Sequence, residues 1–89
     1  MQPMEPKQCY LCGRKTCIEK HHVMSGWANR RWSESYGLWV YLCADCHRGT
    51  EGAQYSKETN LMLRKEAQVA FEEIYGHEKW FDIFKKNYV

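Results

Sequence analysis

Two cysteine pairs lie near the start and near the middle of the chain. They read Cys9-Tyr-Leu-Cys12 and Cys43-Ala-Asp-Cys46, so two residues separate the thiols within each pair. This spacing lets both sulfurs of a pair turn onto one metal ion, and two such pairs complete a closed tetrahedral zinc site. A closed site does no chemistry itself, but binding of the metal adds to the free energy of folding. The sequence therefore predicts a structural Zn²⁺ held by Cys9, Cys12, Cys43 and Cys46.

Other interpretations of the cysteines remain open. One pair could be a redox dithiol, or the thiols could be small buried apolar side chains. The fifth cysteine, Cys17, fits neither pair and is expected to be a free thiol that packs, although it could replace Cys9 or Cys12 as a ligand. An odd number of cysteines and no opening signal segment argue against a secreted disulfide framework and predict a cytoplasmic protein.

Three histidines stand beside these pairs in the sequence. His21 and His22 are adjacent between the pairs, and His47 directly follows Cys46. Neighbouring residues of a strand point to opposite faces, so His21 and His22 are expected to have different tasks. Imidazole is a common metal ligand and exchanges a proton near neutral pH, so the pair can supply a ligand and a general base. The simpler interpretation is a zinc-ribbon-like module whose histidines only form hydrogen bonds, with no second metal.

The elements that must position these residues follow from the apolar pattern. Residues 18–23 and 38–42 have the length and composition of strands and are expected to pair. Between them, residues 24–37 are rich in Ser, Gly and Asn, which predicts a long functional loop. A short helix is expected from Ala44, broken at Gly49.

The second half of the chain has helical periodicity. After a polar start at residues 56–60, apolar residues recur at helical spacing and Gly76 stands at the position of a C-terminal cap. The apolar positions are Leu63, Ala67, Ala70, Phe71 and Ile74. A final apolar segment, containing Trp80, Phe81, Ile83, Phe84 and Tyr88, should pack on this helix or on the strands.

Length and charge limit the class of protein. At 89 residues the chain is expected to be one domain, 1–89, that needs a metal to stabilise its small core. The net charge of +2 is compatible with nucleic-acid binding without requiring it. No apolar run approaches the roughly 18 residues of a membrane span, so no membrane role is expected.

The order of these motifs resembles the HNH, or ββα-metal, endonucleases, in particular the small zinc-containing members common in bacteriophages. The resemblance covers about half of the chain, through the first cysteine pair, the run from Glu19 to Val23 and the run from Leu42 to Gly49. It implies that His21 and His47 hold a catalytic divalent ion, Mg²⁺ or Mn²⁺, and that His22 is the general base. The implied activity is hydrolysis of phosphodiester bonds in DNA.

The chain departs from the family pattern at two positions. The family's central Asn, which pins the loop and orients the base, stands five residues before the third zinc cysteine, where this chain has Leu38. Asn29 is a candidate to replace it. A further ligand found on the metal helix of some members has Glu51 and Gln54 as its nearest counterparts.

Cations and aromatic rings alternate within residues 24–37. The set comprises Trp27, Arg30, Arg31, Trp32 and Tyr36. Such a surface can bind phosphates and stack on bases. The same residue types form hot spots for protein partners. In a third interpretation the tryptophans pack on the core and the arginines are solvated.

These observations predict a small α+β fold with a zinc-stapled ββα-metal (HNH-like) core. Residues 1–8 would be a flexible leader, 9–54 the zinc knuckles and HNH-like motif, and 55–89 the C-terminal helices. The expected function is a phage-type endonuclease or nickase in the cytoplasm of a bacterial host, which the three histidines favour. The alternative is a catalytically inactive zinc module that inhibits a protein partner, such as a phage anti-CRISPR inhibitor of a host CRISPR nuclease. Leu38 and the small net charge favour this alternative.

Overall fold

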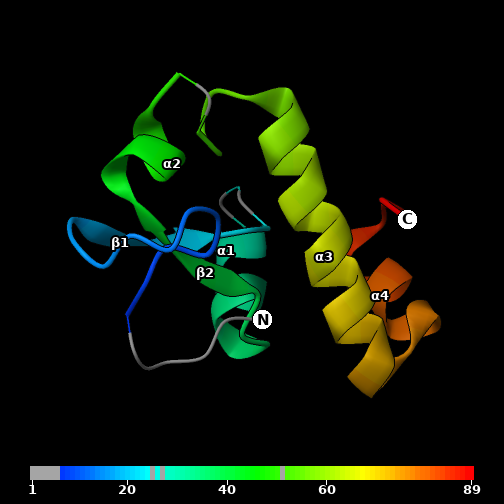
Figure 1. Ribbon diagram of the computed structural model, residues 1–89. Helices are drawn as coiled ribbons and strands as arrows, with labels where there is room; N and C mark the ends of the chain where they lie inside the picture. The colour runs from blue at the N-terminus through cyan, green and yellow to red at the C-terminus, as the bar shows by residue number, and fades with distance from the viewer. Residues whose placement is uncertain (1–6, 25, 27, 51) are drawn as a thin grey trace.

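The computed structural model describes residues 7–24, 26, 28–50 and 52–89. These residues form a two-stranded sheet and four helices, so the predicted small α+β class is confirmed (Figure 1). In chain order the elements are β1 (Ile18–His22), α1 (Asn29–Ser35), β2 (Trp39–Cys43), α2 (Ala44–Arg48), α3 (Lys57–Tyr75) and α4 (His77–Phe84). Residues 1–6 of the predicted leader lie outside the described part of the chain.

The two strands form an antiparallel hairpin, which confirms the predicted pairing. Ile18 lies opposite Cys43 and His22 lies opposite Trp39. All five residues of β2 are buried, which explains why its sequence is a continuous apolar run. Leu38 precedes β2 and is also buried in the core.

Helix α1 corrects the prediction that residues 24–37 are a loop without regular structure. Its serines and asparagine have weak helix propensity, so composition alone favoured a loop. Tertiary contacts decide otherwise, because Ser33 is fully buried and its hydroxyl bonds the backbone of Met24. Trp32 and Tyr36 also pack against the core from this segment.

Helix α3 begins after Ser56, the first residue of the predicted polar start, and ends at Gly76, the predicted C-terminal cap. The Ser56 hydroxyl accepts a hydrogen bond from the Thr59 amide at 3.2 Å, and Gly76 takes a φ of 88° that favours glycine. Leu63 and Phe71 are buried on the predicted apolar face. Ile74 does not belong to that face, because it is 75% exposed.

The C-terminal segment packs back onto α3, as predicted. Trp80 of α4 is fully buried, and its indole N–H donates to the Lys86 carbonyl at 2.8 Å. The buried Gln68 side chain of α3 accepts a hydrogen bond from the Tyr88 amide at 2.7 Å. These bonds hold the last residues against the helix pair.

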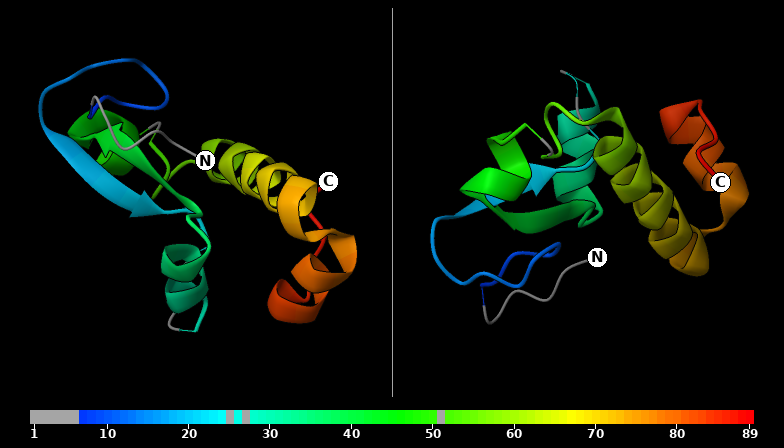
Figure 2. Two further views of the ribbon diagram at one scale, coloured as in Figure 1. Left: turned by 90° about the horizontal axis from the view of Figure 1, so that it is seen from below. Right: turned by 45° about the horizontal axis from the view of Figure 1, so that its top comes forward.

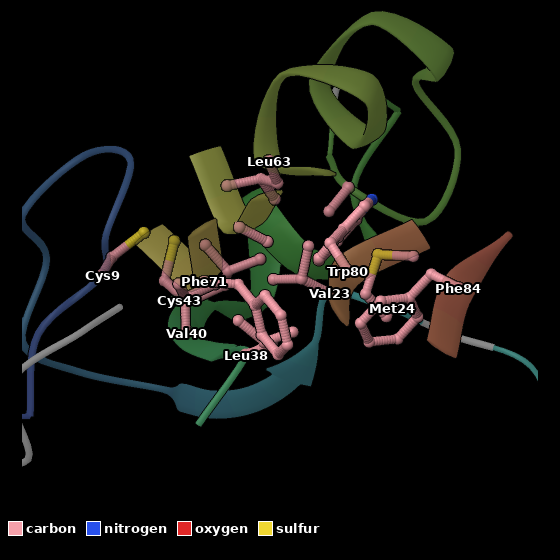
Figure 3. Close-up of a cluster of buried hydrophobic side chains, with 13 residues drawn as sticks. Cys9, Val23, Met24, Leu38, Val40, Cys43, Leu63, Phe71, Trp80 and Phe84 are labelled. Carbon is pink, nitrogen blue, oxygen red and sulfur yellow. The ribbon is translucent and has the colours of Figure 1, made fainter. Parts of the chain in front are cut away.

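One core joins the hairpin to the C-terminal helices. The views in Figure 2 show the hairpin with α1 and α2 on one side of the molecule, and α3 with α4 on the other. Between them lies a buried cluster that includes Val40 of β2, Leu63 and Phe71 of α3 and Trp80 of α4, with the sulfur of Cys9 at its end (Figure 3). No helix in the described ranges is long and apolar enough to cross a bilayer.

Candidate functional site

The two cysteine pairs come together in one group. The sulfurs of Cys9, Cys12, Cys43 and Cys46 all lie within 4.8 Å of one another, and those of Cys12 and Cys43 are 3.6 Å apart. Four sulfurs bound tetrahedrally at about 2.3 Å from one zinc ion are about 3.8 Å apart. The group is therefore of the right size and donor type to hold one metal ion such as zinc.

Local backbone contacts build the first knuckle and attach it to the sheet. The Cys12 amide donates to the Cys9 sulfur at 3.4 Å, and the Gly13 amide donates to the Cys9 carbonyl at 2.9 Å. Gly13 has a φ of 81°, which the tight turn requires. The Tyr10 amide donates to the Tyr41 carbonyl of β2 at 2.8 Å. The first pair is thereby fixed beside the second.

The second pair connects β2 to α2. Cys43 ends β2 and Cys46 lies within α2, while the chain after α2 packs closely against its backbone. A Cβ at Gly52 would lie 2.8 Å from the carbonyl oxygens of Asp45 and Cys46, so this return requires glycine. Asp45 also pairs with Arg14 of the first knuckle at 3.1 Å.

The surroundings shift the pKa values of two of these thiols in opposite directions. Burial alone would raise the pKa of Cys9, but hydrogen bonds from the amides of Cys43, Cys12 and Leu11 lower it to about 6. Burial and the neighbouring sulfurs raise the pKa of Cys46 above its ordinary value. A thiolate at one cysteine therefore disfavours a second thiolate beside it. A bound divalent cation would remove this repulsion between negative charges.

The fifth cysteine stands apart from this group. Cys17 is exposed, so the interpretation that it packs in the core is wrong. Its sulfur is not among those that gather in the four-cysteine group.

The alternation of β1 sends its residues to two different helices. Glu19 and His21 contact α2, whereas Lys20 and His22 contact Glu34 of α1. This is the division between the two adjacent histidines that strand geometry predicts. Both histidines nevertheless line one open pocket at the end of the hairpin.

His21 and His47 lie edge to face at the inner wall of that pocket. Their ring centroids are 5.0 Å apart. His21 is 6% exposed, and its Nε2 makes no hydrogen bond to any residue the structure describes. Burial, and after it the charges of His47 and His22, lower the pKa of His21 to about 4. The ring is therefore neutral at pH 7 and keeps a free lone pair.

A carboxylate fixes the orientation of His47. The Glu19 Oε1 atom lies 2.7 Å from His47 Nδ1, and Arg48 holds Glu19 Oε2 at 2.7 Å. The hydrogen bond places a proton on Nδ1 and leaves the lone pair of the neutral ring on Nε2, as in metal-binding histidines backed by a carboxylate. Two such imidazoles suit a divalent transition ion.

The remaining ligands of such an ion would come from outside this pair. Within the described ranges, only the four cysteines form a group of three or more possible metal ligands. Of the two further candidates, Glu51 lies outside the described residues, and Gln54 is exposed at the pocket.

His22 contacts an acidic partner that sequence reasoning did not identify. Its Nε2 lies 2.6 Å from Oε2 of Glu34, whose Oε1 accepts from Lys20 Nζ at 2.7 Å. Lys20, and after it His22, hold the pKa of Glu34 below its ordinary value. Asn29, the predicted partner, stands at the first residue of α1, and Glu34 contacts His22 in its place.

The pocket has a volume of about 1090 Å³, and basic side chains predominate among the charged groups that line it. Its described lining comprises Lys20, His21, His22, Gly26, Arg30, Arg31, Glu34, His47, Ala53, Gln54 and Asn60. The exposed Arg30 and Arg31 therefore stand beside the three histidines. Of the predicted basic and aromatic surface, the two arginines line the same pocket as the histidines.

The two tryptophans of the predicted surface differ from the arginines. Trp32 is partly buried and stacks on Tyr36 with ring centroids 5.9 Å apart, and the Arg31 guanidinium lies 5.1 Å from the Trp32 ring. Trp27 lies outside the described residues. Beyond the pocket, His77 is exposed.

Comparisons with models of protein families, with known proteins and with solved structures gave no match for this chain. The assignment of a function therefore depends on the residues and geometry of the site.

Proposed function

We propose that this protein is a metal-dependent DNA endonuclease or nickase with a ββα-metal fold stapled by zinc. The observation that supports it best is the pair His21 and His47, whose rings lie edge to face with one buried nitrogen unpartnered among the described residues. His22 lies beside them on the same pocket. A buried, neutral, unpartnered imidazole is costly unless it serves a ligand.

The residues of the pocket would have different roles in phosphodiester hydrolysis. When bound at His21 and His47, Mg²⁺ or Mn²⁺ would supply Lewis-acid stabilisation of the charge that grows on the scissile phosphate. His22 would remove a proton from the attacking water. Arg30 and Arg31 would hold the flanking phosphates through their charge.

The four-cysteine group would give this small site its rigidity. His47 directly follows Cys46 in α2, and His21 lies on the strand that pairs with β2. A metal bound by the cysteines would therefore fix both histidine-bearing elements relative to each other.

Plasmid cleavage tests the proposed function. We expect purified, zinc-loaded protein to convert supercoiled plasmid to nicked or linear forms when Mn²⁺ or Mg²⁺ is added. His47→Ala should lose this activity, and His77→Ala is the matched control because His77 is exposed away from the pocket. If the folded, zinc-loaded protein cleaves no plasmid with either ion, the proposed nuclease function is contradicted.

Salt dependence tests the basic side of the pocket. Replacing both Arg30 and Arg31 with Ala should weaken DNA binding and reduce the slope of log affinity against log salt by about 2, if each arginine contacts one phosphate. Fluorescence anisotropy with a labelled duplex at several salt concentrations measures this slope. Lys57 and Lys65 are exposed cations of α3 outside the pocket, so their double Ala variant is the control. Equal slopes in the two double variants would exclude phosphate contacts by the arginines.

One observation favours the second candidate function, an inactive zinc module that inhibits a protein partner. Leu38 occupies the position of the family's central Asn and is buried in the core, where it gives the pocket no polar group. Under this proposal Arg30, Arg31 and the tryptophans would bind a host protein, such as a CRISPR effector nuclease, and catalysis would be absent.

A further inference from the structure

We propose that Glu34 is the positioning residue of His22 and that its neighbour Ser33 fixes the helix that carries it. The catalytic consequence of this arrangement rests on the proposed nuclease function. Together, these adjacent residues of α1 would perform the two tasks, pinning the loop and orienting the base, for which the resemblance expects an Asn where this chain has Leu38.

Glu34 selects the tautomer of the His22 ring. Its carboxylate lies 2.6 Å from Nε2 and can only accept a hydrogen bond there, so Nε2 carries the proton. The lone pair of the neutral ring is then on Nδ1, which becomes the nitrogen able to take a proton from water. A hydrogen bond at one ring nitrogen also fixes the direction of the other.

A second contact holds Glu34 in place. The Lys20 ammonium donates to Oε1 of Glu34 at 2.7 Å and lies 4.3 Å from the centroid of the Trp39 ring on β2. Both carboxylate oxygens of Glu34 therefore contact residues of β1. The Lys20 ammonium also makes a cation–π contact with Trp39 on β2. The carboxylate cannot swing away from His22 without giving up this second contact.

Ser33 ties both ends of the hairpin connection to α1. Its buried hydroxyl donates to the Met24 carbonyl at 2.8 Å and accepts from the Met24 amide at 3.1 Å. Its own carbonyl accepts from the Leu38 amide at 2.8 Å. Met24 follows β1 and Leu38 precedes β2, so one residue holds the chain that leaves the first strand and the chain that enters the second. This places Glu34, the next residue, above the end of β1.

The structure gives a physical reason why position 38 does not need an amide side chain. The Leu38 side chain contributes to the core, while its backbone makes the connections, donating to Ser33 and accepting from the Val23 amide at 3.0 Å. A polar group there would be buried at a cost, whereas the exposed edge of α1 can present a carboxylate to His22 without that cost.

The test uses Glu34→Ala, because the Glu34 side chain is exposed and its removal spares the fold. Ser33→Ala would instead leave the Met24 backbone groups buried without partners. Long-range ¹H–¹⁵N NMR of the full-length, zinc-loaded protein reads the tautomer of His22. We expect Nε2–H in the parent, a mixture in Glu34→Ala, and retention of Nε2–H in Glu34→Gln, whose amide oxygen still accepts.

Plasmid cleavage by the same variants measures the consequence. We expect kcat of Glu34→Ala to fall roughly ten- to a hundred-fold with KM for DNA little changed, and Glu34→Gln to recover part of the loss. The matched control is Glu73→Ala, an exposed glutamate of α3 outside the pocket.

The two readouts separate this proposal from the proposed function. An unchanged His22 tautomer in Glu34→Ala overturns the positioning role, whether or not the protein is a nuclease. A changed tautomer with unchanged kcat overturns its catalytic consequence. If the parent cleaves no DNA, the proposed function fails, and the NMR comparison still decides whether Glu34 holds the ring.

Discussion

Cys43→Ala is expected to unfold the first half of the protein. Cys43 ends β2, begins the turn into α2 and belongs to the group that gathers both cysteine pairs. A structural zinc site contributes apparent binding free energies of about 10–16 kcal/mol in small zinc domains, which is comparable to or larger than the net stability of a whole domain. Loss of one ligand from four should therefore remove the hairpin's support.

Circular dichroism and elemental analysis check this expectation. The parent should contain one zinc ion per chain and lose its cooperative thermal transition when a strong chelator is added. Cys17→Ala is the matched control, because Cys17 is exposed and outside the four-cysteine group, and it should keep both zinc and fold. A parent that is folded and free of zinc or any other metal would contradict the structural site.

His22→Ala is expected to remove DNA cleavage and leave the fold intact. A general base contributes roughly 10²- to 10⁴-fold to the rate, so the activity should fall below detection in a plasmid assay. His22 is not one of the four residues that could hold zinc and is not part of the buried cluster. The zinc content and melting temperature of the variant should therefore match those of the parent. His77→Ala again supplies the control for loss of an imidazole. Equal cleavage by His22→Ala and the parent would exclude the role of His22 as base.

The same variant distinguishes the two candidate functions in cells. If the protein is a nuclease of the proposed phage type, folded His22→Ala protein should fail to perform its task in a phage-infected host. If it is an inhibitor that binds a host nuclease, that variant should keep its full effect. Truncation of Trp27 or Trp32 should then weaken the protein complex by more than about 2 kcal/mol.

Local signals explain the parts of the fold that sequence predicts well. The helix cap at Ser56, the glycine at position 76 and the apolar run of β2 all act over a few residues, so they can be recognised without knowing the tertiary structure. Helix α1 could not be recognised in this way, because its residue Ser33 is held by a buried hydrogen bond with Met24, nine residues earlier in the chain.

The sequence by itself determined which four thiols could share one metal ion, since two residues between the thiols of each pair let both sulfurs turn onto the same ion. Which side chains surround the histidines was decided only by the tertiary structure. Glu34 reaches His22 across 12 residues of chain, and Glu19 reaches His47 across 28. Both contacts depend on the hairpin register and on how α1 and α2 pack against β1, and such long-range packing is set by the whole core and not by any local pattern of residues.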